Sequence, residues 1–148
     1  MIKWPEHLPA LLLGEAQEIV DPQLRTPMQN GRTFVRRNFT AVPVMFPARW
    51  IMSDTQAQLF DIFYQHTLKD GTEWFELPNK TPSGYGMRVS QFLGAYSRRQ
   101  LSTTHWEYSA NMQMYLRDKT DPNDALFPDE IIYQSLFDIN MNQDWPAA

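Results

Sequence analysis

The side chains best suited to catalysis or metal binding are scattered along this chain. His7, His66 and His105 have no second ligand nearby at the spacing that a metal site uses, so we interpret them as structural or surface residues. Glu73 and Glu76 lie three positions apart in a segment with the character of a strand. In a strand their carboxylates point to opposite faces and do not form an acid–base pair. These residues predict no active site.

Motifs for nucleophilic catalysis and phosphate binding are also missing. The chain has no Gly-x-Ser-x-Gly elbow, no Gly-x-x-x-x-Gly-Lys-Ser/Thr loop and no Gly-x-Gly-x-x-Gly turn. Ser-Gly-Tyr-Gly at 83–86 is better explained as a loop between strands. The absence of cysteine excludes a thiol nucleophile, a cysteine-ligated metal and a disulfide framework. We therefore predict that the protein is not an enzyme and needs no cofactor.

Arginines are the remaining side chains that could bind a charged partner. They are Arg32, Arg36, Arg37, Arg49, Arg98 and Arg99. With their aromatic neighbours they could form a nucleic-acid patch, but the chain carries a net charge of -4. Pairing of these arginines with the acidic tail of a neighbouring subunit, residues 118–148, explains the same residues, and we favour it.

Charge is divided unevenly along the chain. Residues 118–148 contain seven acids against Lys119 alone, a balance of -6, whereas residues 1–117 have a balance of +2. Such asymmetry indicates either an acidic tail that binds a basic surface, on its own or a neighbouring subunit, or a simply solvated tail.

Two segments have the strict alternation of half-buried strands. In 104–117, Trp106, Tyr108, Ala110, Met112, Met114 and Leu116 occupy every second position. In 42–52, Val42, Val44, Phe46, Ala48, Trp50 and Met52 do the same. Alternate side chains of a strand point to opposite faces, so each segment predicts a strand with one dry face. Pro43 and Pro47 place the second strand at an edge, a bulge or a bend.

One helix, about 54–69, is predicted to cover that dry face. It begins at Ser53 or Asp54, and its apolar residues Ala57, Phe60, Phe63 or Tyr64, and Leu68 recur at helical spacing. Gly71 stands where a left-handed C-terminal cap belongs.

The other expected elements are shorter. We predict strands at 33–39, 73–78 and 85–94, a loop at 79–84, a connection at 95–103 and a short helix at 129–137. Residues 1–31, rich in proline, predict an extended arm without regular elements. The arm (1–31), a central domain (32–117) and an acidic tail (118–148) give an α+β fold, an antiparallel β-sandwich or strongly curved sheet with one flanking helix.

Several motifs occur in an order that resembles a family of small structural proteins encoded among the tail genes of long-tailed bacteriophages. They are Trp4-Pro5, Asp21-Pro22, Arg36-Arg37-x-Phe39, Lys69-Asp70-Gly71-x-x-Trp74-Phe75, Phe92-x-Gly94-x-Tyr96 and Trp106-Glu107-x-Ser109-Ala110. The similarity spans about residues 3–117 and leaves the acidic tail outside it. It extends to minor and distal tail proteins and to the tail-tube fold, a β-sandwich with a flanking helix that assembles into rings.

The resemblance implies a virion protein that forms a ring of six copies at the tail tip or distal tube. Its partners would be copies of itself, other tail or neck proteins and passing DNA that is not specifically bound, with assembly in the host cytoplasm and no membrane insertion. The interface residues that we expect are Trp4, Leu8, Leu11, Arg36, Arg37, Arg98, Arg99 and Phe137. The alternatives are a head-to-tail connector or tail-completion protein of the neck, a nucleic-acid-binding domain and a small-ligand-binding domain.

Overall fold

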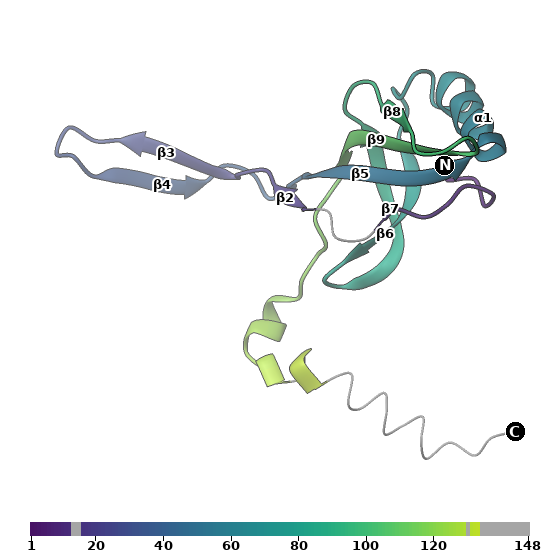
Figure 1. Ribbon diagram of the computed structural model, residues 1–148. Helices are drawn as coiled ribbons and strands as arrows, with labels where there is room; N and C mark the ends of the chain where they lie inside the picture. The colour runs from purple at the N-terminus through teal and green to yellow at the C-terminus, as the bar shows by residue number, and fades with distance from the viewer. Residues whose placement is uncertain (13–15, 130, 134–148) are drawn as a thin grey trace, which may run out of the picture. The chain divides into compact units, whose positions relative to one another are not determined.

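The computed structural model of the chain describes residues 1–12, 16–129 and 131–133. The chain forms two compact units, Met1–Arg117 and Asp118–Ala148. The larger unit contains a seven-stranded sheet, a helix and a separate two-stranded hairpin (Figure 1). The predicted α+β class, a mainly antiparallel sheet with one flanking helix, is confirmed.

Two long strands form the centre of the sheet. β5 (Val44–Ser53) pairs antiparallel with β9 (His105–Met114), from Val44 opposite Met114 to Ser53 opposite His105. The side chains of β5 alternate between buried and more exposed positions, as their sequence predicts. Pro47 is tolerated because β2 (Glu18–Ile19) pairs with the other edge of β5 at Val44 and Met45, and among the described residues no strand pairs there with Pro47.

One edge of β9 changes partner along its length, and β7 (Gly84–Phe92) lies between β9 and β6 (Phe75–Thr81). Residues 84–90 of β7 pair with β6. Residues 90–92 of β7 pair with the end of β9. β8 (Ser97–Gln100) then pairs with the beginning of β9. In Figure 1, β6 and β7 run at a steep angle to β5 and β9. Of the two predicted arrangements, a curved sheet with a flanking helix is the one that describes this topology.

The helix has an irregular second half. α1 (Asp54–Ile62) begins after Ser53, whose amide donates to Gln56 Oε1 at 3.1 Å, and it continues into a π-helical turn, η1 (Phe63–Thr67). Phe63 and Tyr64 are both buried in the core, because they lie three and four residues after Phe60 and so share its face of the helix. The chain then leaves the helix through three left-handed residues, Lys69, Asp70 and Gly71. Gly71 is left-handed as predicted, but the position directly after the C-cap residue Leu68, where the left-handed cap belongs, is held by Lys69.

Aromatic rings fill the space between helix and sheet. Trp50 is fully buried and stacks on Trp4 with ring centroids 5.2 Å apart, while Phe60 of the helix contacts Tyr108 of β9 at 4.9 Å. Trp4 reaches this core because β1 (Ile2–Lys3) pairs in parallel with the beginning of β6. The start of the chain is therefore part of the folded domain.

Several element predictions need correction. The described part of residues 1–31 contains the strands β1, β2 and β3 (Gln23–Pro27), because their backbone groups pair with β6, β5 and β4 (Thr33–Arg37). Residues 79–81 belong to β6, since they pair with the first residues of β7. The expected connection at 95–103 contains β8, whose four polar residues are all exposed and leave no alternation in the sequence.

The unit Asp118–Ala148 contains a short 3-10 helix, η2 (Pro122–Ala125), where Asp121 accepts a hydrogen bond from the Asn123 amide at 2.9 Å. Helical backbone also occurs at 128–129 and 131–133. The rest of the helix predicted at 129–137 lies outside the described residues, as does Phe137. Among the described helices, none is long and apolar enough to cross a membrane.

Candidate assembly surfaces

A largely exposed part of the larger unit is the hairpin of β3 and β4 (Thr33–Arg37). Its strands pair with each other from Gln23 opposite Arg37 to Pro27 opposite Thr33, in a sheet of their own. The turn closes through the amide of Gly31, which has a φ of +80° and donates to the Met28 carbonyl at 3.1 Å. Every residue from 25 to 41 is exposed, so the hairpin has no core.

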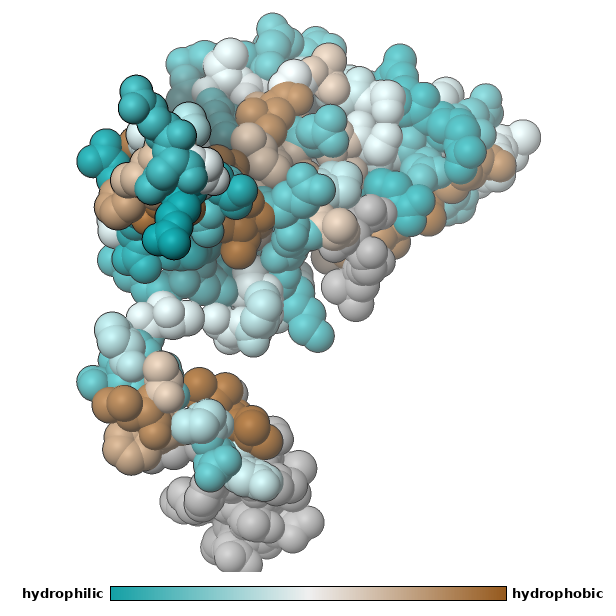
Figure 2. Space-filling model, turned by 90° about the vertical axis from the view of Figure 1, so that its left-hand side faces the viewer, coloured by the Kyte–Doolittle hydropathy of each residue, from teal (hydrophilic) through white to brown (hydrophobic). Residues whose placement is uncertain are grey.

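The hairpin carries arginines on both faces. Residues directly opposite each other in a ladder point to the same side, so Arg25 and Arg37 share one face and Arg36 lies on the other. At the base of the hairpin a pocket of about 280 Å³ is lined by Arg36, Arg37 and Arg117 together with Pro22, Gln23 and Val35. In Figure 2, which is viewed from the side where the hairpin lies in Figure 1, hydrophilic and hydrophobic side chains are mixed at the surface.

On the main sheet, by contrast, the arginines have acidic partners. Glu107 of β9 accepts from Arg49 of β5 at 3.3 Å and from Arg99 of β8 at 2.6 Å, although its side chain is only 14% exposed. These ion pairs link β5, β8 and β9 on the face of the sheet away from the aromatic core. The outer edge of β8 is exposed along its whole length.

A polar cluster joins the helix to β8 and β9. Asp61 accepts from the Tyr96 hydroxyl at 2.6 Å and from the Arg98 guanidinium at 3.0 Å, and the Tyr108 hydroxyl lies 3.4 Å from the same carboxylate. Burial raises the pKa of Tyr96 above its usual value of 10.0, and the hydrogen bond to Asp61 raises that pKa further. Burial also raises the pKa of Tyr108. The cluster therefore holds both hydroxyls in their neutral form and serves to anchor the helix.

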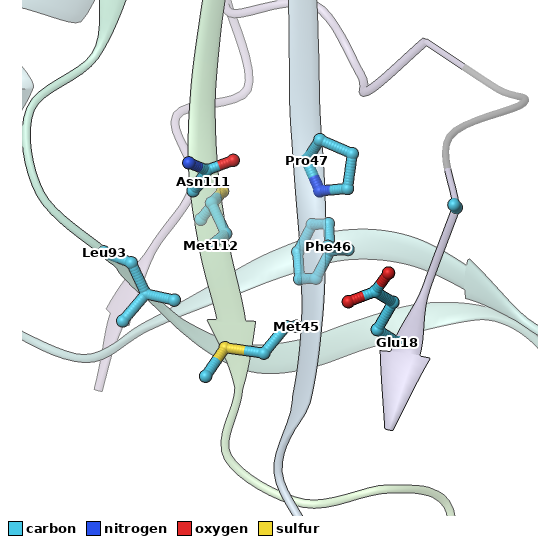
Figure 3. A pocket seen from close by; sticks show the side chains of 8 residues that line it. Glu18, Met45, Phe46, Pro47, Leu93, Asn111 and Met112 are labelled. Carbon is cyan, nitrogen blue, oxygen red and sulfur yellow. The ribbon is translucent and has the colours of Figure 1, made fainter. Parts of the chain in front are cut away.

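A groove of about 400 Å³ lies beside β5 and β9 (Figure 3). Its walls are apolar except for Asn111 and Glu18, and Figure 3 shows Glu18 on the opposite side of these strands from Leu93. A second groove, of about 420 Å³, lies along the start of the chain near Trp4 and Met87. Neither groove gathers the converging polar groups that a small-molecule site requires.

The residues predicted for an interface fall into three groups. Trp4 and Leu8 are each only 6% exposed and pack in the core of their own chain, and Leu11 is partly buried against it. Arg36 and Arg37 stand exposed on the hairpin. Arg98 and Arg99 are exposed on β8 with acidic partners.

The candidate catalytic groups do not come together. His7, His66 and His105 are exposed on separate elements, and Glu73 pairs with Lys69 at 3.0 Å. Within the described part of the chain, no group of three or more His, Cys, Asp or Glu side chains is arranged to hold a metal ion. Sequence reasoning missed the roles of Asp61 and Glu107, because their partners come from other elements.

The acidic unit presents both charge and apolar surface. Asp121, Asp124 and Asp129 are exposed. Leu126 is 71% and Phe127 is 58% exposed.

Comparison with known proteins gives one informative likeness. No family model and no curated protein matches the chain. Among solved structures, a chain in the tail of an empty GTA (gene transfer agent) particle with C6 symmetry is similar to it, with a TM-score of 0.51 and 12% sequence identity. The two chains share a fold. The match covers 78% of this chain and 86% of the other, so it includes most of both.

Proposed function

We propose that this protein is a structural subunit of a phage-like tail and that its copies assemble into a ring. The observation that carries this proposal is the fold shared with a chain of a C6-symmetric tail over 78% of this sequence and 86% of that one. The motifs of the sequence resemble phage tail proteins independently of that likeness. Together they favour a structural role over a catalytic one.

The surface of the larger unit suits assembly. The outer edge of β8 exposes backbone donors and acceptors, and such an edge invites pairing with another chain. The hairpin exposes Phe34, Val35 and Met28 at 54%, 49% and 48% without a core to bury them. A ring gives each copy a neighbour on both sides, so it covers such surfaces in every subunit at once.

The finer features of the proposal follow by analogy. We infer six copies per ring, a position at the tail tip or distal tube, and a central path through which DNA passes. Acidic groups on the wall of that channel would keep the DNA phosphates from being held. A basic channel wall in the assembled ring would contradict this part of the proposal.

Native mass spectrometry and electron microscopy of the purified full-length chain test the assembly. The expected result is a closed ring, with six copies as the predicted number. Electron microscopy of particles that contain the protein tests its location, and density for this fold in the tail is expected. A monomer that occurs in no particle, or a location at the neck, would overturn the assignment to the tail.

A further inference from the structure

Opposite charges are concentrated in two exposed parts of this chain. Residues 22–38 contain four arginines and no acid. Residues 118–129 contain four acids and one base. Charges of one sign that are gathered on an exposed element favour a partner of the other sign.

The arginines of the hairpin differ from those of the sheet in their partners. Arg49, Arg98 and Arg99 all pair with carboxylates of neighbouring elements. Within the residues that the structure describes, Arg25 bonds only to Gln23 Oε1, at 3.1 Å, which leaves its charge without an acidic partner. Arg37 likewise has no ion pair in this part of the chain, and it lines the basal pocket together with Arg117. The hairpin thus presents guanidinium groups that are ready to bind carboxylates.

The hairpin also has no buried face that would stabilise it by itself. A two-stranded sheet without a hydrophobic face against a core is only marginally stable in water. Here both faces are exposed, including Phe34 and Val35. The acidic segment has the matching features, because Leu126 and Phe127 are exposed beside Asp124 and Asp129. Each part offers the charge and the apolar surface that the other needs.

We propose that the hairpin of one copy, residues 22–38, binds the acidic segment 118–129 of a second copy. This inference rests on the proposed assembly and names one of its contacts. Each copy donates a hairpin to one neighbour and receives a hairpin from another, which is a head-to-tail contact that a ring or a stack of rings repeats. A carboxylate-bearing partner suits the hairpin better than DNA does, because the whole chain has a net charge of -4 and repels phosphates.

Cross-linking between copies tests the contact directly. The chain has no cysteine, so single cysteines report one site each. Gln23→Cys and Asn123→Cys chains, one of them carrying a tag that changes its mass, are mixed and treated with a short bis-maleimide. The expected product is a mixed dimer. Adding Arg25→Glu and Arg37→Glu to the first chain lowers its yield at least about tenfold, since the variant repels the acidic segment.

The matched control is the double reversal Lys3→Glu and Lys80→Glu, which makes the same change of net charge away from the hairpin. It leaves the yield of the mixed dimer unchanged. Because the hairpin has no core, its charge reversals leave the thermal unfolding of the protein unchanged, and circular dichroism checks this. A mixed dimer that forms equally well with the hairpin reversed overturns the proposal.

Complementary charge reversals decide whether the contact is made between copies or within one. The first variant carries Arg25→Glu and Arg37→Glu, and the second carries Asp124→Lys and Asp129→Lys. Each variant alone assembles poorly. Mixed in equal amounts they assemble again, because opposite charges now meet only between different chains. If assembly returns only when all four changes are in one chain, the contact lies within a chain and the proposal is wrong.

Two further readouts separate this inference from the function that it rests on. If the variant with Arg25→Glu and Arg37→Glu still forms the rings that the wild-type chain forms, the inference is wrong and the proposed function stands. If the mixed dimer forms but no rings or tail particles contain the protein, the inference stands and the proposed function is wrong. Fluorescence anisotropy with a labelled DNA duplex completes the test. Salt-sensitive DNA binding that the hairpin reversals abolish, without any effect on the cross-link, would assign the hairpin to nucleic acid instead.

Discussion

At the scale of single residues, Trp4 shows how the beginning of the chain belongs to the core. Its ring stacks on Trp50 and Phe75, and it is 6% exposed. Trp4→Ala should lower the free energy of unfolding by about 3 to 5 kcal/mol, because it leaves a cavity among the rings. Chemical denaturation measures this.

The matched control for Trp4 is Phe34→Ala on the hairpin. Phe34 is 54% exposed, so the change in unfolding free energy should stay within about 0.5 kcal/mol. Equal losses for the two variants would show that the ring of Trp4 is not buried as described.

Gly71 is a second residue on which the fold depends. It has a φ of +82°, and an added Cβ would lie 3.0 Å from Phe92 Cβ and from Tyr64 Cε2. Gly71→Ala should therefore cost at least about 2 kcal/mol, from left-handed strain and crowding together. Gly31→Ala has a similar φ of +80° but open space around it, and it lies in the hairpin, which has no core, so the unfolding free energy should change by no more than about 0.5 kcal/mol. A comparison of the two thermal unfolding curves checks the difference.

Tyr96 should make the stability of the folded protein depend on pH in the alkaline range. The folded state raises the pKa of this hydroxyl through burial and through Asp61, so above pH 10.0 the unfolded chain releases the proton more readily. The unfolded state then binds fewer protons, and stability should fall as the pH rises past that value. In Tyr96→Phe the fall should be less steep. Denaturant titrations between neutral and alkaline pH measure both slopes, and parallel slopes would contradict the assignment.

At the scale of elements, the hairpin is separable from the rest of the larger unit. Gln23 and Arg37 face each other at its base, so a two-residue Asn-Gly turn can replace residues 24–36. We expect the unfolding free energy to change by no more than about 0.5 kcal/mol, since no buried side chain is removed. Assembly should be lost. A large drop in stability in circular dichroism, with rings intact in electron microscopy, would assign the hairpin to the fold.

The elements also show why some predictions succeeded. β5 and β9 were predicted from alternation, because one face of each meets the core and the other does not. β8 has four exposed polar residues, so nothing in its own sequence distinguishes it from a loop. It is a strand because Ser97 to Gln100 meet Ser109 to Trp106 of β9.

At the scale of the whole molecule, the division of charge predicts salt-dependent assembly. Screening shortens the reach of exposed charges from about 10 Å at 0.1 M salt to about 3 Å at 1 M salt. The assembled wild-type protein should therefore dissociate as NaCl is raised over this range, while the folded subunit stays intact. Sedimentation velocity measures the dissociation of the assembly, and circular dichroism measures whether the subunit stays folded. Assembly that strengthens with salt would indicate that apolar contacts dominate.

The sequence by itself determined the long strands, the helix that ends shortly before Gly71, and the separation of basic and acidic segments. Each of these depends on spacing or composition within one stretch of chain. Only the tertiary structure decided that Trp4 joins the core, that Glu107 and Asp61 are partners of arginines on other elements, and that the hairpin has no core of its own. Those features depend on contacts between residues far apart in the chain, and local periodicity carries no information about such contacts.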